Sequence, residues 1–189
     1  MIIENVPGAI DFGHVTLLIA GFHKRFPEGN TPFQMVSRLS EEVGELAEQV
    51  NLVEAGGFQE SQRAGFAKEI EDVVRASLTI GNHYQLAFQH NSFEEMYVLA
   101  DPTLLSQTPF QMVSQLCESL GAISKKVNHA QGMGVKQKKY GQLDDRAFAQ
   151  SIEQAVVCAF SLAQYYRLEA DVQKAFLGSF KKMREQGFI

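Results

Sequence analysis

The heptapeptide TPFQMVS occurs twice in this 189-residue chain, at residues 31–37 and, letter for letter, at 108–114. The likeness continues beyond it, because RLSEEVGELAEQVN aligns with QLCESLGAISKKVN at the same offset. After five extra residues in a glycine- and lysine-rich loop, FAKEIEDVVRASLTIGNHYQL aligns with FAQSIEQAVVCAFSLAQYYRL. The chain is therefore an internal duplication, with units at 1–92 and 93–189. Each unit alone would leave one helical face uncovered, so we expect the two units to pack together.

Apolar residues spaced three and four apart predict that both units are helical. Thr31 followed by Pro32 is typical of a helix N-cap with proline at the first helical position, and Gly56–Gly57 would end that helix. Asn91–Ser92 with Glu95 resembles a capping box for a short helix that Asp101–Pro102 would close. The other helices are expected at 11–26, 61–88 and 171–186. The predicted fold class is an all-α helical bundle, with the two repeats packed as an intrachain pseudo-dimer.

Composition narrows the function classes further. No apolar run approaches the roughly 18–20 residues that cross a bilayer, and the N-terminus does not resemble a signal peptide. Cys117 and Cys158 lack metal-ligand spacing and are expected to be small buried hydrophobes. A net charge of −5 disfavours a nucleic acid polymer as partner. We therefore expect a cytoplasmic protein with neither a membrane nor a nucleic acid as partner.

Four carboxylates of the first unit are the candidate metal ligands. Glu42 and Glu45 are three residues apart on one predicted helix, and Glu69 and Asp72 are three apart on the next. Residues at this spacing share a helix face, so an antiparallel hairpin would bring all four together. Converging carboxylates repel unless a cation neutralises them, and hard divalent ions with oxygen ligands suit such a cluster. Mg²⁺, or alternatively Mn²⁺, is the predicted ion.

The second unit provides an internal comparison. At the four equivalent positions it has Ser119, Ala122, Ser151 and Gln154, while the apolar positions around them persist. Charges scattered for solubility have no reason to disappear as a set. A metal site does, because the remaining ligands are of little use once one is lost.

These residues also resemble a known family. EEVGE at 41–45 followed by EIED at 69–72 looks like the EExxE…ExxD signature of the MazG-like all-α NTP pyrophosphohydrolases. That superfamily includes the dimeric dUTPases, the dCTP pyrophosphatases and phosphoribosyl-ATP pyrophosphohydrolase. The resemblance covers the first three predicted helices well and the second unit only as an apolar frame.

The resemblance implies hydrolysis of a nucleoside triphosphate to a nucleoside monophosphate and pyrophosphate. It implies that Glu42, Glu45, Glu69 and Asp72 hold the magnesium and that Glu41 orients or deprotonates the attacking water. Members of the family usually form homo-oligomers whose sites use two subunits. Because the second unit lacks every metal ligand, we expect one working site per pseudo-dimer. Whether the fused chain pairs again as a homodimer stays open.

Several other side chains are candidates for binding the substrate. Phe22, His23 and Phe26 would line a base pocket, although aromatic residues at helical spacing also suit a plain core. The lysine-rich loop, which includes Lys136 and Lys138, would reach a triphosphate, although a solvated basic loop is the more common explanation for any one of these lysines. The substrate-binding candidates are Arg75, Asn82, Lys125, Lys126 and Lys139.

Two rival functions remain beside the NTP pyrophosphohydrolase. One is a pyrophosphohydrolase acting on a phosphoribosyl nucleotide such as phosphoribosyl-ATP. The other is a non-catalytic regulator that binds a nucleotide or a metal. The complete set of four carboxylates in the first unit favours catalysis over the regulator.

Overall fold

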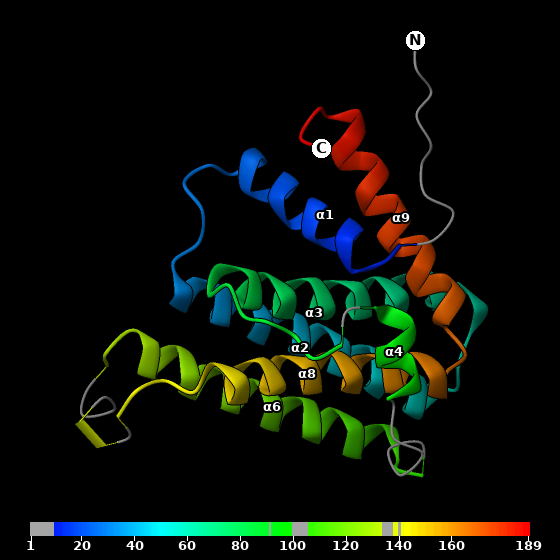
Figure 1. Ribbon diagram of the computed structural model, residues 1–189. Helices are drawn as coiled ribbons and strands as arrows, with labels where there is room; N and C mark the ends of the chain where they lie inside the picture. Colours follow the sequence, from blue (N-terminus) through cyan, green and yellow to red (C-terminus); the bar gives the residue numbers. More distant parts are fainter. Residues whose placement is uncertain (1–9, 91, 100–105, 134–137, 140) are drawn as a thin grey trace.

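The computed structural model describes residues 10–90, 92–99, 106–133, 138–139 and 141–189, and within them the chain is all-helical. Seven α-helices and one short 3₁₀ helix are present among these residues (Figure 1). The helices are α1 (Phe12–Arg25), α2 (Pro32–Gly56), η1 (Glu60–Gln62), α3 (Arg63–His83), α4 (Phe93–Val98), α6 (Pro109–Ala130), α8 (Asp145–Tyr165) and α9 (Glu169–Glu185). The all-α prediction is confirmed for this part of the chain.

The repeated heptapeptide forms the same helix start in both units. The Thr31 hydroxyl accepts a hydrogen bond from the Gln34 N–H at 3.3 Å, and the Gln34 side chain accepts one from the Thr31 N–H at 2.8 Å. Thr108 and Gln111 form the same reciprocal pair at 3.3 Å and 2.8 Å. These capping boxes satisfy backbone N–H groups that the first helical turn leaves unpaired, which explains why the heptapeptide is a helix start. The predicted N-cap at Thr31 is confirmed.

The predicted end of the third helix is wrong, because α3 stops at His83 and does not reach Phe88. Gln85 adopts a left-handed conformation with φ of 54°, and the Leu86 N–H donates to the Gly81 carbonyl at 3.0 Å. The chain then turns back so closely that a Cβ on Gly81 would lie 2.3 Å from Cζ of Phe88. A left-handed residue followed by this backward hydrogen bond is a standard helix C-terminus.

The same helix end recurs at the equivalent place in the second unit. Arg167 has φ of 55°, and the Leu168 N–H donates to the Ala163 carbonyl at 2.7 Å. The duplication is therefore visible in the backbone geometry at the start of α2 and α6 and at the end of α3 and α8.

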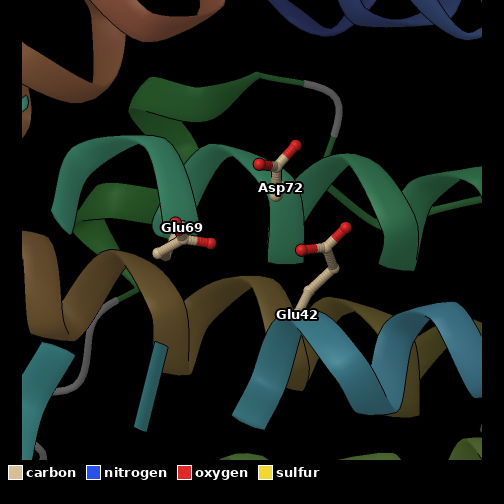
Figure 2. Close-up of side chains that lie close together, drawn as sticks. All are labelled: Glu42, Glu69 and Asp72. Atoms are coloured by element: carbon tan, nitrogen blue, oxygen red, sulfur yellow. The ribbon is translucent and has the colours of Figure 1, made fainter. Parts of the chain in front are cut away.

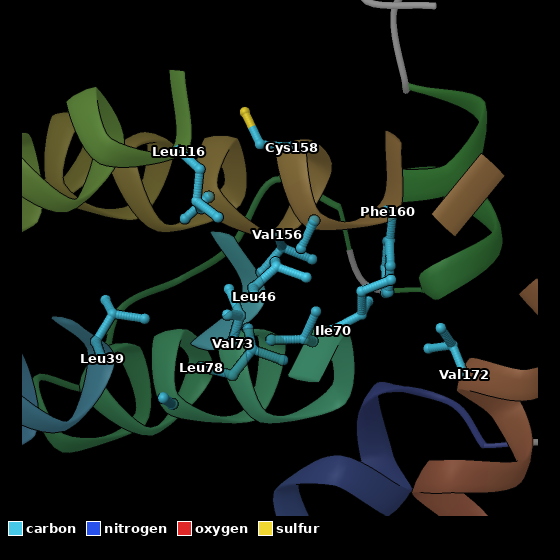
Figure 3. Close-up of a cluster of buried hydrophobic side chains, with 14 of the residues drawn as sticks. Leu39, Leu46, Ile70, Val73, Leu78, Leu116, Val156, Cys158, Phe160 and Val172 are labelled. Carbon is cyan, nitrogen blue, oxygen red and sulfur yellow. The ribbon is translucent and has the colours of Figure 1, made fainter. Parts of the chain in front are cut away.

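The four long helices enclose one continuous core. In Figure 1, α2 lies beside α3 and α6 beside α8, and contacts of α3 with α8 and of α2 with α6 join the two pairs. Figure 3 shows side chains from these helices meeting in a single buried cluster. Its labelled members on the four helices include Leu39, Leu46, Ile70, Val73, Leu116, Val156 and Phe160. Units 1–92 and 93–189 thus contribute to the same core.

Two further helices cover the outer side of α3. α9 packs against α1 and α3, although α9 belongs to the second unit and α1 and α3 to the first. The predicted helix at 171–186 is confirmed as α9, whose inner face consists of four buried side chains: Val172, Phe176, Phe180 and Met183. The short helix α4 begins after Ser92, whose hydroxyl accepts from the Glu95 N–H at 3.0 Å. Asn91, predicted at the start of this helix, and Asp101–Pro102, predicted at its end, lie outside the described residues.

Two expectations from composition have different outcomes. None of the helices that the structure describes combines the length and apolarity needed to span a membrane. Cys158 is buried as predicted, but Cys117 is exposed. The prediction for Cys117 is wrong because it follows the buried Leu116 and so lies on the outer face of α6.

The left-handed helix ends generate a stability prediction. Replacement of Gln85 or Arg167 with glycine should raise the free energy of unfolding by about 1 kcal/mol, since glycine adopts positive φ without the Cβ clash. Urea unfolding followed by circular dichroism measures the change. As a control, Ala64→Gly at an exposed position inside α3 should lower the free energy of unfolding by about 1 kcal/mol. Destabilisation by Gln85→Gly would contradict the proposed helix end.

Candidate metal centre

Three of the four predicted ligands meet between α2 and α3. Figure 2 shows Glu42 reaching from α2 toward Glu69 and Asp72 of α3. Each offers one carboxylate oxygen, and the three oxygens lie within 4.8 Å of one another. Glu42 and Asp72 are buried and Glu69 is half-buried. We call Glu42, Glu69 and Asp72 the acidic cluster.

The fourth predicted ligand and the predicted base lie at the edge of the acidic cluster. Glu45 is exposed and outside the group of three, but its carboxylate helps to raise the pKa of Glu69. Glu41 is also exposed and accepts a hydrogen bond from Arg38 at 3.2 Å. The four carboxylates therefore gather in one region, with three in close contact and Glu45 at the rim.

Basic side chains contact the acidic cluster, and Arg38 and Lys68 among them are not predicted site residues. Arg38 lies 2.5 Å from a Glu42 oxygen, and both Lys68 and Arg75 pair with Asp72. A spacing signal was present, because Arg38 and Lys68 each precede their partner by four residues, one helical turn. Burial alone would lower the pKa of Lys68, but nearby carboxylates outweigh it and raise the pKa.

The acidic cluster nevertheless remains short of positive charge. Burial, followed by the charge of Asp72, raises the pKa of both Glu42 and Glu69 to about 7. Oε2 of Glu42 and Oε2 of Glu69 are buried without a partner, and Oε1 of Glu42 has only its ion pair with Arg38. Buried polar atoms are normally paired, so such oxygens point to a missing partner. Carboxylate oxygens are the ligands that Mg²⁺ and Mn²⁺ prefer, and the residues present therefore fit a divalent cation.

A groove opens beside the acidic cluster. Arg38 and Arg75 line it together with the aromatic side chains of Phe22 and Phe26, and its volume is about 670 Å³. The guanidinium of Arg75 stacks over the Phe22 ring, 4.5 Å from its centroid. His23 also lines this groove, so the three side chains expected to form a base pocket lie on one surface. We call this surface the first groove.

The remaining substrate-binding candidates lie elsewhere. Asn82 is exposed and lines a separate groove beside α1. Lys125 and Lys139 are exposed and Lys126 is half-buried, and none of the three lines the first groove. Lys136 lies outside the described residues. Of the five substrate-binding residues predicted, the structure therefore places only Arg75 at the first groove.

The basic partners disappear from the second unit together with the carboxylates. Where the first unit has Arg38, Lys68 and Arg75, the second has uncharged side chains. These are Gln115, Gln150 and Val157. The acidic cluster and its basic partners are thus confined to one unit.

A buried glutamate that the sequence analysis did not weigh is retained in both units. Glu71 is fully buried and pairs with Lys68 at 2.6 Å and with Arg75 at 3.1 Å. Its equivalent, Glu153, accepts backbone N–H groups from Gln89 at 2.6 Å and His90 at 3.1 Å. The presence of a glutamate at this position in both units could have identified it from the sequence. The contacts of Glu153 with backbone N–H groups indicate a structural role for it.

Comparison of the chain with protein-family models, with curated proteins and with solved structures finds no match in any of the three.

The raised pKa values generate a pH prediction. Because the pKa values of Glu42 and Glu69 rise from 4.5 to about 7 on folding, the folded chain binds more protons than the unfolded chain between these values. This contribution to the stability of the fold is complete below the unfolded pKa of 4.5. It is lost as the pH rises through the folded pKa of about 7. In EDTA, we expect Tm to fall by several degrees between about pH 5 and about pH 8.

Two further measurements isolate the acidic cluster. Glu42→Gln should flatten the fall in Tm, because glutamine mimics the protonated acid at every pH. Millimolar Mg²⁺ or Mn²⁺ should restore Tm near pH 8 in the unsubstituted chain and have little effect in Glu42→Gln. Equal metal stabilisation of both chains would place the bound ion elsewhere.

Proposed function

We propose that this chain is a nucleoside triphosphate pyrophosphohydrolase that depends on a divalent metal and releases a nucleoside monophosphate and pyrophosphate. The observation that most supports this proposal is the position of the acidic cluster. Its unpaired buried oxygens lie next to a groove that combines arginine with aromatic side chains. A nucleotide bound to a divalent cation carries the matching groups, namely phosphates, a flat base and the metal.

The metal would be held by the acidic cluster, with Glu45 as a further ligand at its rim. Mg²⁺ is the proposed ion and Mn²⁺ the alternative, since both prefer oxygen ligands. When bound, the ion neutralises the triphosphate and polarises the phosphorus that is attacked. Arg38 balances part of the charge of Glu42 within the protein itself.

The first groove would bind the organic part and the phosphates of the substrate. Arg75 both pairs with Asp72 and lines the groove, so one side chain connects the acidic cluster with the anion-binding surface. Arginine binds phosphate oxygens through paired N–H groups, so Arg38 and Arg75 are the proposed phosphate ligands. Phe22 and Phe26 offer aromatic faces against which a base would stack.

Glu41 is the proposed general base. It is exposed next to the buried Glu42 on α2, and its hydrogen bond with Arg38 restrains its carboxylate. In this role it accepts the proton of the attacking water while the water oxygen forms its bond to phosphorus. The bond from that phosphorus to the bridging oxygen breaks, and pyrophosphate leaves.

The proposal includes the tandem architecture. We infer a MazG-like pseudo-dimer in which the first unit supplies the metal ligands and the second packs against it as support. The MazG-like signature at 41–45 and 69–72 supports this family assignment. Cytoplasmic location and a homodimer of the fused chain stay predictions.

A non-catalytic regulator is the second candidate, and one observation favours it. Asp72 already pairs with two basic side chains, Lys68 and Arg75, as in an ion-pair network that needs no turnover. Oε2 of Glu42 and Oε2 of Glu69, which have no partner, favour a bound cation over a purely structural network, and the complete set of four carboxylates favours catalysis. A phosphoribosyl nucleotide such as phosphoribosyl-ATP offers the same triphosphate and belongs in the substrate test.

Pyrophosphate release from a panel of canonical and modified (d)NTPs and phosphoribosyl-ATP, with Mg²⁺, tests the proposal. We expect turnover of at least one of them. Asp72→Asn and Glu45→Gln should lower kcat by about 100-fold or more, because each removes a charge that holds the metal. Glu48→Gln changes an exposed glutamate on the same helix and should leave kcat unchanged. Metal-dependent nucleotide binding without turnover would establish the regulator instead.

A further inference from the structure

The second unit has its own groove where the first unit has the acidic cluster. Gln115, Ser119 and Gln154 line this groove, and they are the repeat equivalents of Arg38, Glu42 and Asp72. Its volume is about 650 Å³, within the range of small-molecule sites. We call it the second groove. The duplication has therefore kept a hollow at this position while replacing its chemistry.

The second groove is unsuited to phosphates. Among its lining residues that the structure describes there is no lysine or arginine. Two acidic side chains line it instead, the exposed Glu118 and the buried Glu153. A bound phosphate would face this negative charge without a positive partner.

The second groove is equally unsuited to a divalent cation. Glu153 Oε1 already accepts two backbone N–H groups, from Gln89 and His90. The positions equivalent to the acidic cluster carry a hydroxyl, as Ser119 and Ser151, and an amide, as Gln154. Neutral side chains in these places cannot offset the charge of a hard cation as carboxylates do.

Two amide oxygens of the second groove, Oε1 of Gln115 and Oε1 of Gln107, are buried without a partner. Nδ1 of His90 has only a 3.6 Å contact with Oε1 of Glu153. A buried polar atom that is left unpaired is costly. Two such oxygens at one groove point to a ligand that carries hydrogen-bond donors. Val157 and Leu99 add apolar surface to the same groove.

We propose that the second groove binds an uncharged nucleoside through its base, without metal. A base presents donors and acceptors side by side on a flat ring, and a glutamine amide offers one of each in the complementary arrangement. Gln115 and Gln154 are the proposed contacts to the edge of the base. Val157 is the proposed apolar contact to its face. The inference does not depend on catalysis at the acidic cluster.

Calorimetric titration of the full chain in EDTA with adenosine, guanosine, cytidine and uridine tests this proposal. We expect one of them to saturate a single site with a Kd below about 1 mM. The corresponding triphosphate, also in EDTA, should bind at least tenfold more weakly, because its phosphates meet Glu118 and Glu153. Gln115→Leu and Gln154→Leu should each weaken nucleoside binding at least tenfold. Circular dichroism and Tm establish that both variants are folded.

Arg38→Leu is the matched control, because Arg38 occupies the equivalent position in the first unit. It should leave nucleoside binding in EDTA unchanged. Loss of binding in Arg38→Leu with retention in Gln115→Leu would place the base in the first groove and overturn the proposal. Failure of all four nucleosides to bind the folded chain would overturn it as well. Neither result bears on pyrophosphate release, so the two proposals fail separately.

Discussion

Packing of α2 against α3 buries negative charge that has to be offset. The oxygens of Glu42, Glu69 and Asp72 lie within 4.8 Å of one another. At about 4 Å, two like charges repel by roughly 4 kcal/mol even with an effective dielectric constant of about 20. Basic side chains on the same two helices, Arg38 and Lys68 among them, offset part of this repulsion. Burial, together with the remaining repulsion, raises the pKa of Glu42 and of Glu69, and a divalent cation would offset both effects.

The second unit shows that the fold does not need this charge. α6 and α8 pack as α2 and α3 do, with the apolar positions kept, as in Ile70 and Ile152 or Phe66 and Phe148. Yet the acidic cluster and its basic partners are absent from α6 and α8 at the equivalent positions. Buried ion pairs contribute little net stability, because desolvation opposes their attraction. A network that is dispensable for packing and costly to bury is better explained by what it binds.

Features that depend on neighbouring residues could be predicted from the sequence, whereas features that depend on packing between helices could not. Helix starts depend on a few neighbouring residues, so Thr31 identified its helix directly. The end of α3 was missed because Gln85 takes a conformation that usually signals itself by glycine. Helical spacing placed the carboxylates on facing surfaces, but their depth depends on packing between helices. Periodicity alone could not separate the buried Glu42 from the exposed Glu45, which lies outside the close group.

The difference between the two grooves bears on how a duplicated site diverges. A groove without a ligand loses nothing when apolar side chains fill it, and the gain in buried apolar area would favour that outcome. In the second unit the positions of Ala122 and Val157 became apolar, whereas Gln115, Gln150 and Gln154 kept hydrogen-bonding groups. One of these, Gln115, retains a buried oxygen without a partner. Removal of charge with retention of hydrogen bonding is therefore a change of ligand class, from ionic to neutral, on an unchanged helical frame.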